Sequence, residues 1–257
     1  MIFFWFLCFL CRRKCVTLYL QYEKVCFNML KRVVLIMMGC CFVLSVAAQQ
    51  RLQQLADSIV KYQMKSGGWP KNQNWLEGVD PKEAKEWRKT GIGSTIDNGA
   101  TTSEMESLAK AVTYMDKMAV DVPKWVDKDE FNKRKEGYCE AFKRGLAYLL
   151  KMQYENGGFP QFYPEKKTED YSSQITFNDN AMVNVLKLLR DVANDDERFG
   201  HLAIDKGTRK KCLAAYEKGV ECVLNCQIRV DGAGKEIILY FHVKIWIFLR
   251  SRGRVDT

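Results

Sequence analysis

Two short clusters of Asp and Asn residues carry the oxygen atoms in this sequence that are best suited to bind a metal ion. Asp97 and Asn98 form the first cluster, and Asn178, Asp179 and Asn180 form the second. Carboxylate and amide oxygens are the ligands that a hard cation such as Ca²⁺ prefers. The same residue types also cap helix N-termini, so capping is the alternative interpretation. Both clusters occur at equivalent places in a repeated pattern, which favours one shared site on a common rim.

Several aromatic residues and one lysine lie in turns between helical patterns. Trp69 and Tyr163 are in such turns, and so are Trp75, Phe159 and Phe162. Aromatic rings on an exposed rim can stack on sugar rings, and the alternative is that they cover helix ends. Lys71 follows Trp69 and Pro70 and could pair with a carboxylate, unless it is simply a solvated surface lysine.

Other familiar catalytic arrangements are missing from the sequence. The two histidines, His201 and His242, have no Ser or Cys at a recognisable spacing. The Gly-rich stretch that begins at Gly91 lacks the lysine of a phosphate-binding loop. Cys222 and Cys226 would need two further ligands to hold a metal, so we expect thiols there rather than a disulfide or a metal site.

The elements that position these residues are helices. Apolar residues recur at helical spacing over residues 52–62, 105–115, 142–152, 181–192 and 212–226. Strand-like alternation is almost absent from the same stretch. We therefore predict an all-α fold with one domain over residues 49–236.

The helical pattern repeats itself. Residues 63–72 read Gln-Met-Lys-Ser-Gly-Gly-Trp-Pro-Lys-Asn and residues 153–162 read Gln-Tyr-Glu-Asn-Gly-Gly-Phe-Pro-Gln-Phe, while Gln227 begins a fainter third copy. The clusters recur as Thr-Ile-Asp-Asn-Gly-Ala over 95–100 and Thr-Phe-Asn-Asp-Asn-Ala over 176–181. Repeated helix pairs must stack to bury their apolar faces. Three or more such units usually close into a bundle or a toroid, so two units and one helix predict an incomplete stack of helical hairpins.

The two ends of the chain differ from this body. The net charge of +9 comes almost entirely from residues 1–48 and 237–257, so the body carries no basic stripe and we expect no nucleic-acid partner. Residues 29–48 have the basic start, apolar centre and small-residue end of a signal peptide, which predicts a secreted or periplasmic protein. We expect membrane contact only through this leader or the two ends, and we expect a monomer.

Residues 1–28 are predicted to be a mis-called extension upstream of Met29, with a hydrophobic anchor as the alternative. Residues 237–257 turn abruptly β-branched, aromatic and basic. We interpret them as an aberrant tail, from a frameshift or truncation, with a short membrane anchor as the alternative.

The repeated segments resemble family 10 pectate lyases, over about residues 50–233. The resemblance is carried by Gly67–Asn72, Thr95–Thr102, Gln153–Pro164 and Ile175–Met182. It implies an (α/α) toroid-like domain and Ca²⁺-dependent β-elimination of polygalacturonate, a pectic polysaccharide. It also implies that Asp97, Asn98 and Asp179 hold calcium and that Asp97 acts in catalysis. Lys71, Trp69, Asn98 and Tyr163 are the expected substrate contacts.

The sequence departs from this family after Lys235. The arginine that serves as the family's base lies in a later Arg-Ala-Tyr-Glu-like stretch, which this sequence does not contain. Loss of a catalytic base costs roughly two to four powers of ten in rate. We therefore expect an inactive chain, and the alternative is a non-catalytic helical protein that binds acidic glycans. Residues 143–159 also resemble the Gln-Trp repeat of triterpene cyclases, but the Asp-rich acid motif of those enzymes is missing.

Overall fold

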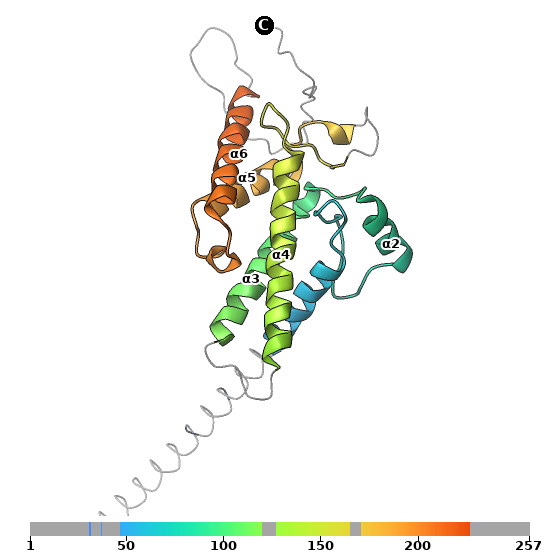
Figure 1. The fold of residues 1–257 in the computed structure, drawn as a ribbon. Coiled ribbons are helices and arrows are strands. Elements are labelled where there is room, and N and C mark those ends of the chain that lie inside the picture. The colour runs from blue at the N-terminus through green and yellow to red at the C-terminus, as the bar shows by residue number, and fades with distance from the viewer. Residues whose placement is uncertain (1–30, 32–36, 38–46, 120–126, 165–170, 227–257) are drawn as a thin grey trace, which may run out of the picture. The chain divides into compact units, whose positions relative to one another are not determined.

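The structure is a computed structural model that describes residues 31, 37, 47–119, 127–164 and 171–226 (Figure 1). The chain divides into two units, Met1–Arg51 and Leu52–Thr257, and the elements described here belong to the second. The predictions for residues 1–28 and 237–257 lie outside the described residues, as do those for most of residues 29–48.

The second unit is built from helices and short 3-10 turns. A first helix ends at residue 61. The later elements are α2 (Pro81–Thr90), η1 (Asp97–Gly99), α3 (Thr102–Ala119), α4 (Lys128–Met152), η2 (Tyr171–Ser173), η3 (Asn178–Asn180), α5 (Ala181–Ala193), η4 (Gly200–Leu202) and α6 (Lys206–Asn225). Extended pairing among the described residues consists of the isolated bridges Thr95–Phe162 and Pro160–Ile175. The all-α prediction is confirmed.

The predicted helices are present, and α3, α4 and α6 extend beyond their predicted ranges. The patterns over 105–115 and 181–192 correspond to α3 and α5, while those over 142–152 and 212–226 are the C-terminal parts of α4 and α6. Asp127 caps the polar start of α4 and Asp205 that of α6 through side-chain bonds to backbone N–H groups. The sequence analysis missed α2, because this surface helix buries only Ala84 and so has no apolar face.

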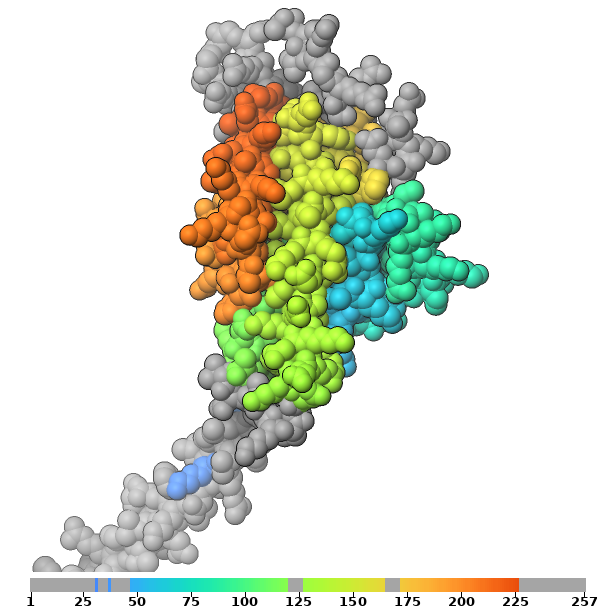
Figure 2. All heavy atoms as spheres, in the orientation of Figure 1, coloured from blue at the N-terminus to red at the C-terminus, as the bar shows by residue number. Residues whose placement is uncertain are grey.

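Neighbouring helices pack in pairs. α3 contacts α4 and α5 contacts α6, and α4 also contacts α6, which joins the two pairs. Figure 2 shows α4 and α6 side by side on one face of this unit. Leu108 and Val112 of α3 and Phe142 and Leu149 of α4 are fully buried. The apolar faces that were predicted to stack therefore do stack.

The cysteines of the described residues agree with the sequence analysis. Cys139, Cys212, Cys222 and Cys226 are free cysteines, as expected. None of the described helices combines the length and the apolar character that a membrane crossing requires.

Each of the two repeated turns is joined to a later helix by the glutamine that begins the repeat. The side-chain nitrogen of Gln63 donates to the carbonyl of Gly67 in its own turn at 2.7 Å. It also donates to the carbonyl of Ala141 in α4 at 2.8 Å. Gly67 has a φ of 99°, and a methyl group added to it would lie 2.6 Å from the carbonyl oxygen of Arg144. Only glycine lets the turn approach α4 this closely.

The second repeat makes the same junction with α6. Gln153 donates to the carbonyl of Gly157 at 3.0 Å and to that of Ala215 at 2.7 Å. Gly157 has a φ of 86°, and an added methyl group would lie 2.1 Å from the carbonyl oxygen of Lys218. The repeat seen in the sequence is therefore a repeat of one docking geometry.

This junction makes Gly157 sensitive to the smallest substitution. We expect Gly157→Ala to lower the free energy of unfolding by about 2–4 kcal/mol, from the positive φ and the clash together. Chemical denaturation followed by circular dichroism would measure it. Gly78→Ala is the matched control, because Gly78 has a φ of 91° with nothing within 4 Å of an added methyl group. Equal losses in the two variants would contradict the docking argument.

Candidate functional site

The two Asp/Asn clusters form short turns of left-handed backbone. Asn98 in η1 has a φ of 52°, and Asp179 and Asn180 have φ values of 48° and 59°. Asn and Asp tolerate this conformation better than other residues with a side chain. The capping interpretation is wrong for these clusters, because Asn180 precedes α5 without a side-chain bond to it and both carboxylate oxygens of Asp97 lie outside any cap.

The structure brings the two clusters together, as the repeat predicted. η1 and η3 contact each other, and η1 also contacts α5. The loop of the second turn holds them in place, since Thr95 Oγ1 donates to the carbonyl of Gln161 at 2.6 Å. The backbone N–H of Ile96 donates to the same carbonyl at 3.2 Å. We refer to the surface formed by η1 and η3 as the acidic rim.

Asp97 is the buried anionic group of the acidic rim. Its side chain is only 2% exposed. Oδ2 accepts a hydrogen bond from Lys71 Nζ at 2.5 Å, so the lysine predicted to pair with a carboxylate does so. Oδ1 is buried and has no hydrogen-bond partner among the described residues. A buried carboxylate oxygen without a partner is costly, so this atom is prepared to accept a cation or a donor.

Two neighbours of the rim were not among the predicted site residues. Asn72 accepts a hydrogen bond from Asn98 Nδ2 at 3.1 Å, and Asn72 itself has a φ of 61°. The ring of Phe162 lies under Lys71, with Nζ 5.7 Å from the ring centroid. Asn72 directly follows Lys71 in the repeated motif, so the motif could have identified it. No sequence signal places Phe162 beside a lysine that is so distant in the chain.

Asp179 supplies an exposed carboxylate to the same rim. Its side chain accepts a hydrogen bond from Asn178 Nδ2 at 2.7 Å. Within the described residues, no three His, Cys, Asp or Glu side chains gather closely enough to hold a metal. The rim instead offers the two carboxylates of Asp97 and Asp179 and the amide oxygens of its asparagines. Such a mixed oxygen set fits the preferences of Ca²⁺.

The aromatic residues of the turns divide into buried and half-buried groups. Trp69 is fully buried, and its indole N–H donates to the carbonyl of Ile59 at 2.8 Å. The expectation that Trp69 stacks on a sugar is therefore not met, because a core position leaves no ring face to a ligand. Trp75 and Phe159 are buried as well. Tyr163 is half-buried, and its backbone N–H donates to the carbonyl of Ser94 at 3.2 Å.

A buried carboxylate anchors the loop that carries Lys71 and Asn72. Glu104, at the start of α3, accepts a hydrogen bond from the indole N–H of Trp75 at 2.9 Å. Trp75 also stacks on Tyr62, with ring centroids 6.2 Å apart. Burial raises the pKa of Glu104 above its usual value, and the hydrogen bond from Trp75 opposes that rise. The loop is thus fixed on the α3 side as well as through Lys71.

The sequence and the fold of this chain are similar to those of known proteins. The sequence family described as pectic acid lyase matches residues 63–122 and 124–237. A structure of a mutant family 10 polysaccharide lyase from Cellvibrio cellulosa, in complex with trigalacturonic acid, has 29% identity and a TM-score of 0.52. The aligned region covers 68% of this chain and 47% of the Cellvibrio cellulosa chain. A second structure of that enzyme gives 29% identity, a TM-score of 0.52, and 68% and 46% coverage. No curated protein matches.

These similarities confirm the predicted fold, which is the (α/α) toroid of the family 10 polysaccharide lyases. The chain spans less than half the length of the two similar structures.

The raised pKa of Glu104 gives its contribution to stability a definite pH dependence. Between the unfolded pKa near 4.5 and the higher folded pKa, the folded state binds more protons, so stability falls as pH rises. Glu104→Gln keeps an acceptor for Trp75 and removes this titration. The wild type therefore loses stability with rising pH that the variant does not lose. We expect the difference in Tm, variant minus wild type, to be higher at pH 8 than at pH 4 by about a few degrees.

Glu106→Gln is the matched control, since Glu106 is exposed on the same helix and its loss changes the net charge equally. Calorimetry at several pH values would give all three curves. A Glu104→Gln difference that stays flat with pH, or that falls, would contradict the assignment.

Proposed function

Because this chain belongs to the pectic acid lyase family, we propose that its acidic rim binds polygalacturonate or a shorter pectic oligosaccharide together with Ca²⁺. The observation that carries the proposal is Asp97, whose buried Oδ1 has no partner while Oδ2 is paired with Lys71. The similar enzyme from Cellvibrio cellulosa was captured with trigalacturonic acid, which supports a ligand of this class.

Asp97, Asn98 and Asp179 are the residues that would hold the calcium ion, because they present the carboxylate and amide oxygens of the rim. When bound, calcium neutralises the carboxylate of a uronate, which makes the C5 proton of that sugar more acidic for β-elimination. Lys71 adds a second positive charge beside Asp97, and its side chain is 35% exposed. It can therefore approach a ligand carboxylate without losing its contact with Asp97.

Asn98 and Tyr163 complete the proposed substrate contacts. Asn98 is held in its turn by the bond to Asn72, so its amide stays on the rim. Tyr163 is half-buried and packs against Tyr148, with ring centroids 6.1 Å apart. A ring fixed in this way can support a sugar at low entropic cost.

The proton of C5 needs a base, and no described arginine contacts Asp97, Asn98 or Asp179. Arg144, for example, donates to Gln63 at 2.8 Å, and Arg134, Arg198 and Arg209 pair with other carboxylates. We therefore propose that the 257-residue chain by itself binds the acidic glycan without cleaving it. This observation favours the non-catalytic acidic-glycan-binding protein as the second candidate function.

Export from the cytoplasm is part of the proposal and is supported by the signal-peptide pattern of residues 29–48. The N-terminus of the mature protein would then fall near Gln49, which N-terminal sequencing of exported protein can establish.

Binding is the decisive property to measure. We expect trigalacturonate to bind the wild type in the presence of Ca²⁺ and to lose at least about tenfold in affinity in EDTA. Asp97→Asn should cause a similar loss with Ca²⁺ present, because it removes one ligand charge and the partner of Lys71. Isothermal titration calorimetry would measure both effects.

Asp129→Asn is the control, since it removes one exposed carboxylate at the start of α4. The absorbance of an unsaturated sugar product would be followed in samples of the wild type and of Asp97→Asn from the same titrations. We expect no more product with the wild type than with Asp97→Asn. Trigalacturonate binding in Ca²⁺ that is as tight as in EDTA and is not weakened by Asp97→Asn would overturn the proposed site. Robust turnover would overturn the proposed lack of cleavage.

A further inference from the structure

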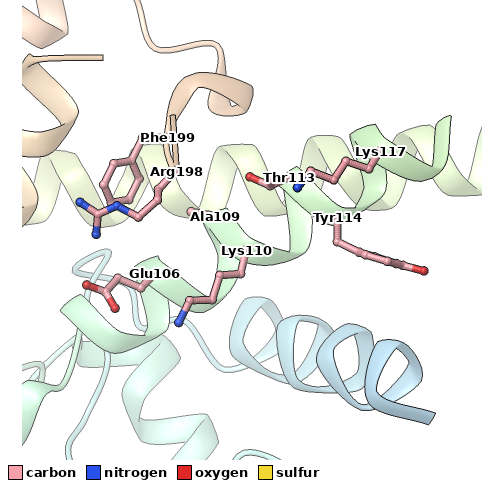
Figure 3. Close-up of a pocket in the computed structure, with 8 residues that line it drawn as sticks. All are labelled: Glu106, Ala109, Lys110, Thr113, Tyr114, Lys117, Arg198 and Phe199. Carbon is pink, nitrogen blue, oxygen red and sulfur yellow. The ribbon is translucent and has the colours of Figure 1, made fainter. Parts of the chain in front are cut away.

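A concave surface lies between α3 and the segment that precedes η4. It has a volume of about 230 Å³. Figure 3 shows its lining, which comes from successive turns of α3 and from two residues of the α5–η4 connection. The lining residues are Glu106, Ala109, Lys110, Thr113, Tyr114, Lys117, Arg198 and Phe199. We call this surface the α3 groove.

The cations of the α3 groove differ in their availability. Arg198 is held by Asp191 and Asp196, so its charge is already balanced. Lys110 and Lys117 are exposed and make no ion pair within the described part of the chain. The groove therefore presents two lysine charges to a ligand, while Glu106 marks its acidic end one turn before Lys110.

The floor of the groove is apolar, with one unsatisfied polar atom beside it. Ala109 and Phe199 are buried at 2% and 1% exposure, and the guanidinium of Arg198 covers the Phe199 ring at 5.2 Å. Tyr114 is half-buried and adds a second ring. The hydroxyl of Thr113 is buried and has no hydrogen-bond partner among the described residues. An apolar floor with few polar groups is typical of ligand sites.

The spacing of the two lysines defines the shape of the ligand. Lys110 and Lys117 are seven residues apart on one helix, which separates them by about 10.5 Å along the axis. This is the separation of their Cα atoms, and two extended side chains suit two negative charges at a similar separation. A chain that repeats a negative charge and presents apolar faces between the charges fits both this spacing and the apolar floor. An oligouronate has this chemistry, because its carboxylates alternate with the C–H faces of sugar rings.

We propose that the α3 groove is a second binding site for an acidic pectic oligosaccharide, independent of calcium. Lys110 and Lys117 pair with two carboxylates of the chain, and Tyr114 contacts a sugar ring between them. The choice of ligand rests on the proposed function, since it takes the same polymer as the acidic rim. At about 230 Å³ the groove is smaller than a full ligand site, so it holds a short stretch of a longer polymer.

The test separates the two sites by their dependence on calcium. In EDTA and low salt, we expect hexagalacturonate to bind the wild type weakly, with one site seen by calorimetry. Lys110→Gln combined with Lys117→Gln should reduce this affinity at least about tenfold. Asp129→Asn should leave it unchanged, because Asp129 lies at the start of α4 and does not line the groove.

Lys82→Gln combined with Lys85→Gln is the matched control, since it removes the same charge from exposed positions of α2. Absence of hexagalacturonate binding in EDTA would overturn the second site. An equal loss of affinity in this control would also overturn it, because the glycan would then respond only to the net charge of the protein. The proposed function has its own test, because it would be overturned if trigalacturonate showed no calcium-dependent binding to the wild type. Circular dichroism of each variant would confirm that it is folded.

Discussion

The bonds from Gln63 to α4 and from Gln153 to α6 determine where the turns of this unit can lie. The side-chain nitrogen of each glutamine donates to two carbonyls, one in its own turn and one in that later helix. These bonds are buried or partly buried, where an unmade bond is costly, so the turn and the helix are held at one distance and register. The glycines of the turns permit that distance, since any side chain would meet the helix backbone.

The position of the turns then decides the chemistry of the acidic rim. Lys71 and Asn72 follow the first turn, and Gln161 and Phe162 follow the second. With both turns docked, side chains of the first loop reach Asp97 and Asn98, and the backbone carbonyl of Gln161 in the second loop accepts from Thr95 Oγ1 and from the N–H of Ile96. The uncharged bonds of the docked turns thus place the charged pair of Lys71 and Asp97 on the rim.

The sequence was informative wherever a repeated motif encoded a repeated geometry. The helices, the docking turns and the meeting of the two clusters could all be predicted, because periodicity and spacing reflect backbone packing directly. The burial of Trp69 could not be predicted, because an aromatic residue in a turn has the same local sequence whether it faces solvent or the core. α2 was missed because its pattern lacks an apolar face, and the capping of both clusters was wrong because left-handed residues replaced the expected caps. Contacts between distant segments, such as Phe162 under Lys71, leave no local signal.

The two repeats share a backbone and differ in where they place charge. Lys71 and Asp97 correspond in the repeat to Gln161 and Asn178, so a charged pair in the first unit is replaced by two neutral amide side chains in the second. The second unit has its carboxylate one residue later, at Asp179, where the side chain is exposed. A buried carboxylate needs the lysine, and an exposed one does not. The rim therefore combines one carboxylate fixed by the protein with one open to solvent, and this pair is the basis of the calcium site that we propose.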